Sequence, residues 1–239
     1  MSGHSKWAGI KHKKAAADAK RANVFTRLAN AITIAARRGG GDVNFNPALR
    51  TAVDTARKAN MPKDNVERAI KRGTGELGGA VVEELLYEGF GPGNVAILVA
   101  ALTDNRNRTA PEIKTIFTKN GGRFAEGGGV AYLFRQQGVI RVDLPKSHVE
   151  RFEELAIEGG ADDYVIGDEH GIIYVASTSL HTLRDAVEAA GFTVTSADIE
   201  WVPNTPIEVS DADLEGAANL IGVLEDHDDV TSVYTNLSE

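Results

Sequence analysis

The chain has 239 residues, of which 42% are hydrophobic and 25% are charged, and its formal net charge is −8 at pH 7. This composition is ordinary for a globular protein, and the length allows one large domain or two to three small ones. The chain contains no cysteine, which excludes disulfides, thiolate metal sites and thiol nucleophiles, and no apolar run approaches the roughly 18 residues that span a bilayer.

Positive charge is concentrated in the first third of the chain. Residues 1–75 carry 16 Lys and Arg against 5 Asp and Glu, a net charge of +11. The remaining residues carry 10 against 29, a net charge of −19. An acidic protein with one strongly basic segment is polarised for an anionic partner, and nucleic acid is the obvious candidate.

Aromatic and histidine side chains are set among these cations. Cationic side chains neutralise phosphates, and aromatic rings stack on bases. The candidate nucleic-acid-binding residues are His4, Lys6, Trp7, Lys11, His12, Lys13, Lys14, Lys20, Arg21 and Arg27. The alternative interpretation of the same pattern is a solvated, charged helix face without a ligand.

The first third of the chain is predicted to be helical. Apolar residues recur at spacings of three and four from Phe25 to Ala35, and the run Gly39-Gly40-Gly41 ends this helix. Asn46 followed by Pro47 is typical of a helix start, and a third helix is expected to begin near Pro62. We therefore predict a basic helical domain over residues 1–76.

The rest of the chain alternates between strand and helix patterns. The first expected elements are strand 84–87, strand 95–102, a helix that follows the segment TDNRNRT and ends at Gly121-Gly122, and strand 130–134. A βαββαβ series follows, with strand 139–144, helix 147–158, strands 163–167 and 172–177, helix 180–190 and strand 195–202. The last expected elements are strand 207–209, helix 211–225 and strand 230–236.

The βαββαβ series is the ferredoxin-like signature. The elements before and after it are too few to form a domain separately, but together they make a second α/β sandwich. We therefore predict an α+β multidomain protein in which a ferredoxin-like domain, 135–203, is inserted into a discontinuous α/β domain, 77–134 plus 204–239.

Arg106 and Arg108 form a second candidate site, in the segment TDNRNRT. They lie in or beside the first turn of the expected helix, where the helix dipole disfavours cations. A bound phosphate would reverse that sign, because free amides and two guanidiniums could surround it. The alternative is that both arginines pair with acids such as Glu83, Glu84 or Glu88.

Motifs that would carry catalysis or bind a metal are not evident. The Gly-rich segment 89–94 precedes a strand rather than a helix, so we interpret it as a turn rather than a dinucleotide site. The histidines lack metal-pair spacing, and the acidic run 225–229 matches no calcium loop. We therefore expect no enzymatic activity, no cofactor and no metal.

Several motifs resemble one known family. The opening GHSKWAGIKHKKAAADAKR, the GGGD at 39–42 and the later LYEGFGPG and TDNRNRT occur in the order expected for the YebC/PmpR family. The resemblance covers the whole chain and implies the same three-domain plan. Members of this family include presumed bacterial transcriptional regulators and a mitochondrial translational activator of cytochrome oxidase subunit one.

We expect a cytoplasmic, monomeric, non-enzymatic regulator that binds nucleic acid and has no membrane partner, because the basic N-terminus lacks the apolar core of a signal peptide. The resemblance implies a DNA-binding transcriptional regulator. The alternative is a ribosome-associated translation factor that binds ribosomal or transfer RNA through residues 1–76. An enzyme with an inter-domain cleft and an adaptor that acts through the acidic ferredoxin-like domain are weaker hypotheses.

Overall fold

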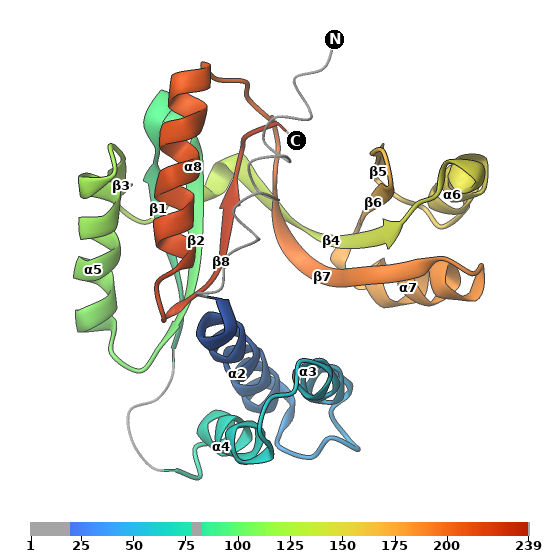
Figure 1. The fold of residues 1–239 in the computed structure, drawn as a ribbon, viewed down its shortest axis with the longest axis horizontal. Coiled ribbons are helices and arrows are strands. Elements are labelled where there is room, and N and C mark those ends of the chain that lie inside the picture. Colours follow the sequence, from blue (N-terminus) through green and yellow to red (C-terminus); the bar gives the residue numbers. More distant parts are fainter. Residues whose placement is uncertain (1–19, 78–82, 239) are drawn as a thin grey trace. The chain divides into compact units, whose positions relative to one another are not determined.

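The computed structural model describes residues 20–77 and 83–238. Contacts within the chain separate two compact units: unit 1 comprises Met1–Ala131 and Pro206–Glu239, and unit 2 comprises Tyr132–Thr205. The predicted α+β multidomain fold is confirmed, with helices first and two four-stranded sheets after them (Figure 1). The predicted separation of a helical domain at residue 76 stays a prediction.

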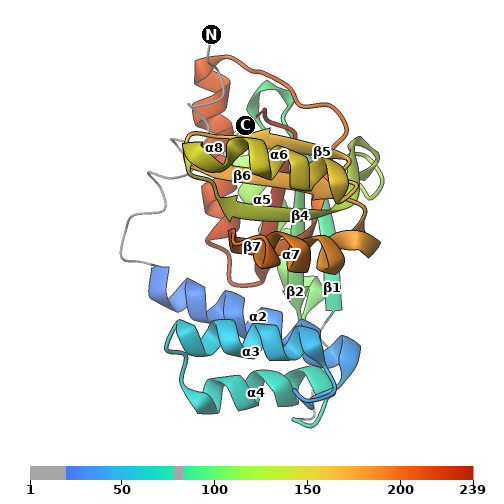
Figure 2. The same cartoon turned by 90° about the vertical axis from the view of Figure 1, so that its right-hand side faces the viewer.

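Unit 1 begins with three helices, α2 (Lys20–Gly39), α3 (Pro47–Lys58) and α4 (Lys63–Thr74). Helix α2 packs against both α3 and α4, and the three helices lie together in both ribbon views (Figures 1 and 2). Their shared core includes Ile32 of α2, Leu49 and Val53 of α3, and Val66 of α4. Leu49 and Val53 are four residues apart, so they lie on one face of α3.

The sheet of unit 1 combines strands from the two separate segments of the chain that make up this unit. Its antiparallel strands lie in the order β3-β1-β2-β8. Helices α5 and α8 pack against the same face of this sheet. The bounds are β1 Glu83–Phe90, β2 Ala96–Thr103, α5 Arg106–Lys119, β3 Arg123–Ala125, α8 Asp211–Glu225 and β8 Val230–Thr235.

The core of this α/β part lies between the sheet and the two helices. Ile97 and Val99 of β2 contribute from the sheet, Phe117 from α5 and Leu220 from α8, and all four are fully buried. The apolar run that predicted a buried strand is therefore β2, which is paired on both edges and buried almost throughout.

Unit 2 is the predicted ferredoxin-like βαββαβ unit. Its strands lie in the order β5-β6-β4-β7, and α6 and α7 cover one face, where Ile140, Phe152 and Leu183 are buried together (Figure 2). The bounds are β4 Phe134–Asp143, α6 Val149–Glu158, β5 Asp163–Ile166, β6 His170–Val175, α7 Leu180–Ala189 and β7 Thr193–Pro203.

Two of the expected strands were wrong, and one strand was missed. The segment 130–134 is not a strand of the first sheet, because Ala131–Leu133 forms a 3-10 helix and Phe134 begins β4. The first sheet instead takes β3, a three-residue strand that the sequence analysis missed. In place of strand 207–209 there is a single parallel bridge between Ile207 and Leu237.

Candidate nucleic-acid interface

Most of the predicted nucleic-acid-binding side chains lie outside the described residues. His4, Lys6, Trp7, Lys11, His12, Lys13 and Lys14 precede residue 20. Lys20, Arg21 and Arg27 lie on α2, but the structure describes only their backbone. Their role in binding nucleic acid therefore stays a prediction.

The described helices add exposed cations that the sequence analysis did not assign to the interface. Lys58 at the end of α3 and Arg68 and Lys71 on α4 are exposed, and within the described part of the chain none of them has an acid within 4 Å. Arg57 and Lys63 lie near Asp54 and Glu67, at 3.6 and 3.5 Å. Such exposed pairs are weak, so their cations remain able to meet a phosphate.

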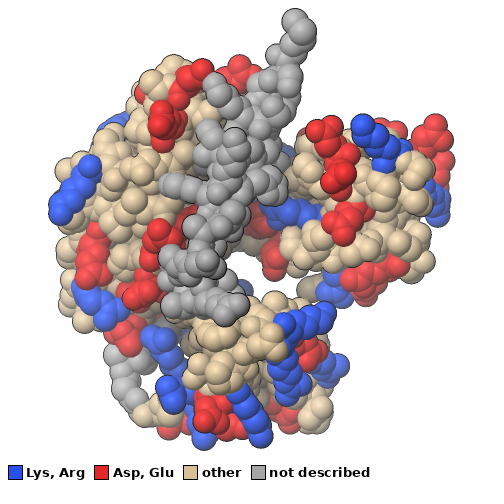
Figure 3. Space-filling model, in the orientation of Figure 1, with Lys and Arg blue, Asp and Glu red and all other residues tan. Residues whose placement is uncertain are grey.

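The fold of α3 and α4 explains why these cations point outward. Each helix buries one apolar stripe against α2, with Leu49 and Val53 on α3 and Val66 and Ala69 on α4. The charged residues between them must occupy the opposite faces. Figure 3 shows Lys and Arg side chains over these helices, with fewer acids among them.

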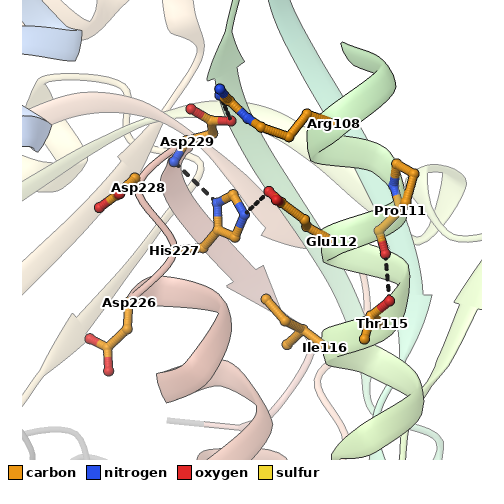
Figure 4. A pocket seen from close by; sticks show the side chains of 9 residues that line it. All are labelled: Arg108, Pro111, Glu112, Thr115, Ile116, Asp226, His227, Asp228 and Asp229. Carbon is orange, nitrogen blue, oxygen red and sulfur yellow. Dashed lines mark hydrogen bonds and ion pairs between the residues drawn. The ribbon is translucent and has the colours of Figure 1, made fainter. Parts of the chain in front are cut away.

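Arg108 of the second candidate site is held by an ion pair. Its Nη2 donates to Asp229 Oδ2 at 2.8 Å (Figure 4). The same nitrogen lies 3.8 Å from Asp104 Oδ1. The sequence analysis offered an acid as one alternative, but it named other acids. Asp229 follows α8 and lies 121 residues further along the chain.

Asp229 is the centre of a small polar network. Its Oδ2 also accepts the hydroxyl of Thr109 at 2.6 Å. Burial alone would raise the pKa of Asp229, but the hydrogen bonds from Thr109 and Arg108 outweigh it and hold that pKa below its usual value. The carboxylate is therefore ionised at neutral pH and fixes the turn after α8 to the first turns of α5.

An open pocket of about 860 Å³ lies beside this network, between α5 and the turn after α8. His227 spans it: its Nε2 is 3.0 Å from Glu112 Oε2, and its Nδ1 accepts the backbone N–H of Asp229 at 3.1 Å (Figure 4). Both ring nitrogens are occupied, so the imidazole is not free to act as a general base.

The charges of the pocket do not favour a phosphate. Its lining brings one guanidinium, from Arg108, together with four carboxylates, from Glu112, Asp226, Asp228 and Asp229. Among the described residues no cluster of His, Asp or Glu has the arrangement of a metal site. Arg106 is exposed and forms no ion pair with a described residue, so a phosphate contact at Arg106 stays a prediction.

Glu84 and Glu88 are two of the acids named from the sequence as partners of the arginines: Glu84 pairs with Arg38 instead, and the carboxylate of Glu88 on β1 is occupied by backbone amides. Glu88 is 5% exposed and accepts the backbone N–H groups of Gly128, Val130 and Ala131 at 2.6, 2.5 and 2.8 Å. Burial alone would raise the pKa of Glu88, but these three donors lower it. The amides of Val130 and Ala131 are thereby used by a side chain, which explains why this apolar segment does not form a strand.

No helix in the two described stretches, 20–77 and 83–238, is both long and apolar enough to cross a bilayer.

Comparison with known proteins identifies the family of the chain. Residues 5–76 match the family model described as the TACO1/YebC protein N-terminal domain, and residues 82–237 match the TACO1/YebC second and third domain. A conserved hypothetical protein from Aquifex aeolicus has a similar crystal structure, with a TM-score of 0.84 and 42% identity, over 93% of this chain and 92% of that one.

Bacterial relatives match along almost the whole chain. A protein from Trichlorobacter lovleyi is 50% identical over 236 residues, and one from Geobacter sulfurreducens is 49% identical over 236 residues. Each match covers 99% of this chain and 95% of the relative, and both relatives are named probable transcriptional regulatory proteins. The chain therefore belongs to the TACO1/YebC family.

Proposed function

We propose that this chain is a non-enzymatic regulator of gene expression that binds nucleic acid through its basic N-terminal third. The observation that carries this proposal is the division of charge, +11 over residues 1–75 and −19 over the remainder. A phosphate backbone is attracted by the first part and repelled by the second, so the first part is the one that contacts the partner. The names of the relatives support a regulatory role.

A ribosome-associated factor that binds ribosomal or transfer RNA is the second candidate. The observation in its favour is the same acidic remainder, whose net charge of −19 opposes a long DNA duplex that passes close to it. Structured RNA presents loops and ends that a basic helical part can contact locally while acidic surfaces stay clear of the backbone.

The test replaces exposed cations of the helical part. The triple variant Lys58→Gln, Lys71→Gln and Arg68→Gln removes three positive charges that no described ion pair uses. A matched control, Lys114→Gln, Lys119→Gln and Lys146→Gln, makes the same charge change at exposed positions outside the helical part.

Binding of the full chain to a DNA duplex and to a structured RNA is then measured across a salt series. About five or six neutralised phosphates would give the wild type a slope of log K against log salt near −4 to −5. If all three replaced cations meet phosphates, the first triple should lower the magnitude of this slope by about 2 to 3, because each contact contributes roughly 0.7–0.9. Equal effects of the two triples, or a flat wild-type response, would contradict the proposal.

Sedimentation with ribosomes in the same salt series separates the two candidates. A ribosome-associated factor should sediment with ribosomes at low salt and leave them as the salt rises, and it should prefer the RNA to the duplex. A transcriptional regulator should prefer the duplex and remain in the free fraction.

A further inference from the structure

Phe45 is the most exposed of the large hydrophobic side chains in the described part of the chain. It is 86% exposed and lies in the loop of residues 40–46, which connects α2 to α3. A single exposed apolar side chain is common on protein surfaces. What distinguishes Phe45 is how firmly the backbone around it is held.

The side chain of Asn46 holds the end of this loop through hydrogen bonds. Its side chain is buried, and its Nδ2 donates to the carbonyl oxygens of Ala35 and Gly40, both at 2.8 Å. Its Oδ1 accepts the backbone N–H of Leu49 at 3.0 Å and so caps α3. One buried amide thus connects the loop to the helix before it and to the helix after it.

Arg50 and Asp42 hold the remaining backbone of the loop. Arg50 donates through Nε to the carbonyl oxygen of Val43 at 3.0 Å and through Nη2 to that of Asn44 at 2.9 Å. The backbone N–H of Phe45 donates to the carbonyl oxygen of Asp42 at 3.2 Å. A ring presented on a backbone that is already ordered loses little conformational entropy on binding.

The loop that carries Phe45 adjoins two helix ends that bear cations. The loop leaves the last turn of α2, which carries Arg37 and Arg38, and its Gly41 lies against the end of α4, where a Cβ at Gly41 would be 2.9 Å from Thr74 Cγ2. Lys71 precedes Thr74 by less than one turn and is exposed. Arg38 is paired with Glu84 at 2.5 Å, so Lys71 and Arg50 are the cations of this region that the proposal uses.

This combination fits a nucleic acid better than an apolar protein groove. A nucleobase offers a flat π face to the ring, and the sugar-phosphate backbone of the strand offers phosphates to the neighbouring cations. Bases inside a duplex are already stacked on each other, so the available partner is an unpaired base in a single strand, loop or bulge.

We propose that Phe45 is a stacking platform for an unpaired nucleobase, and that Arg50 and Lys71 face the adjoining phosphates. This proposal rests on the proposed function, because it requires that nucleic acid is the partner. It adds the part of the nucleic acid that is recognised, an unpaired base, and the loop that recognises it.

The experiment compares three substitutions in the full chain: Phe45→Ala, Phe45→Leu and Phe45→Trp. Each is titrated against an RNA hairpin with an unpaired loop, the same sequence as single-stranded DNA, and a fully paired duplex. Tyr132→Ala is the matched control, since Tyr132 is also an exposed aromatic residue, at 69%, but lies in unit 2. Thermal melts monitor folding, and a 5-iodouridine in the hairpin loop reports by photocrosslinking which aromatic residue it touches.

We expect Phe45→Ala to weaken binding to the hairpin and the single strand by roughly 5- to 150-fold, the range typical of a lost base stack. Phe45→Trp should retain affinity, and Phe45→Leu should behave like Phe45→Ala because Leu has no π face. The salt slope should not change, because the ring carries no charge. The crosslink should map to Phe45.

Three results would overturn the proposal while leaving the proposed function intact. These are unchanged binding by Phe45→Ala, wild-type affinity in Phe45→Leu, and an equal loss for duplex and hairpin. Unchanged binding by Phe45→Ala would make an apolar protein partner the better occupant of the loop, whereas an equal loss for duplex and hairpin would mean that the ring contacts nucleic acid without stacking on an unpaired base. If the wild type binds none of the three nucleic acids, the proposed function itself fails, and the two failures are distinguishable.

Discussion

Replacing Glu88 by Gln tests the buried carboxylate that fixes the segment before unit 2. The substitution keeps the size and shape of the side chain but removes its charge. In the wild type, Oε2 accepts the N–H groups of Val130 and Ala131, and Oε1 accepts that of Gly128. Glutamine has only one oxygen, which serves best in the position of Oε2, so its NH₂ group must face the N–H of Gly128.

The expected cost follows from these three contacts. Two hydrogen bonds lose their charge assistance, at about 1 kcal/mol each, since bonds to charged groups are worth roughly 1.5–3 and neutral ones 0.5–1.5 kcal/mol. The third hydrogen bond, from Gly128, is replaced by two N–H donors that face each other, and this destabilises the folded state by roughly a further 1 kcal/mol or more. Glu88→Gln should therefore lower the free energy of unfolding of unit 1 by about 3 kcal/mol at pH 7.

Urea unfolding followed by circular dichroism measures this loss, and hydrogen exchange at the amides of Gly128, Val130 and Ala131 locates it. The pKa of Glu88 is lowered in the folded state, so its contribution is complete above the unfolded value of about 4.3 and declines as the pH falls toward the folded value. The difference between wild type and variant should thus be constant from pH 7 to about 5.5 and narrow below about 4.3.

Glu83→Gln is the control, because Glu83 begins the same strand in an exposed position and should change stability by less than about 0.5 kcal/mol. Equal stability of Glu88→Gln and wild type, or a deficit that widens as the pH falls, would refute this account of the carboxylate.

Two further predictions concern α5 and the sheet beneath it. The double substitution Arg106→Gln and Arg108→Gln should lower the melting temperature, because Asp229 loses its partner. Arg106→Gln alone should leave the melting temperature unchanged. A double variant that melts like the wild type but loses affinity for RNA or DNA would instead favour a phosphate site. Gly89→Ala should destabilise the protein by about 1–3 kcal/mol in urea unfolding, since its Cβ would lie 2.4 Å from Phe117 Cε1, while Gly127→Ala, with no atom within 4 Å of its Cβ, should be neutral.

The order of helices and strands could be predicted because local patterns determine it. The βαββαβ series can be recognised because apolar residues alternate in its strands and recur every three to four residues in its helices. The start of α3 is indicated by Asn46 and Pro47. The strand predicted at 130–134 was wrong because the hydrophobicity of this segment does not show that two of its backbone N–H groups donate to Glu88, some 40 residues earlier. The strand Arg123–Ala125 was missed because three residues are too few to show an alternation.

The candidate sites were predicted less well, for a different reason. An acid partner for Arg108 was foreseen as one alternative, but many acids follow it in the chain and only the fold brings Asp229 to it. Phe45 was not noticed, because one aromatic residue in a polar loop makes no periodic pattern. The available signal was its position directly before the N-cap of α3: an apolar residue there often packs against the fourth residue of the helix, but that residue is the charged Arg50.

The discontinuous sheet of unit 1 has a consequence for the order in which the protein folds during synthesis. Strand β8 pairs with β2 across more than 120 residues, and all of unit 2 leaves the ribosome before β8 does. Unit 2 is contiguous and can fold at once. Until β8 and α8 have been synthesised, one edge of β2 is unpaired and α8 does not yet cover the sheet. At this stage Ile97 and Val99 of the nascent chain are exposed and can aggregate or bind a chaperone. A chain that stops before Asp211 should therefore keep a folded unit 2 beside an unfinished sheet.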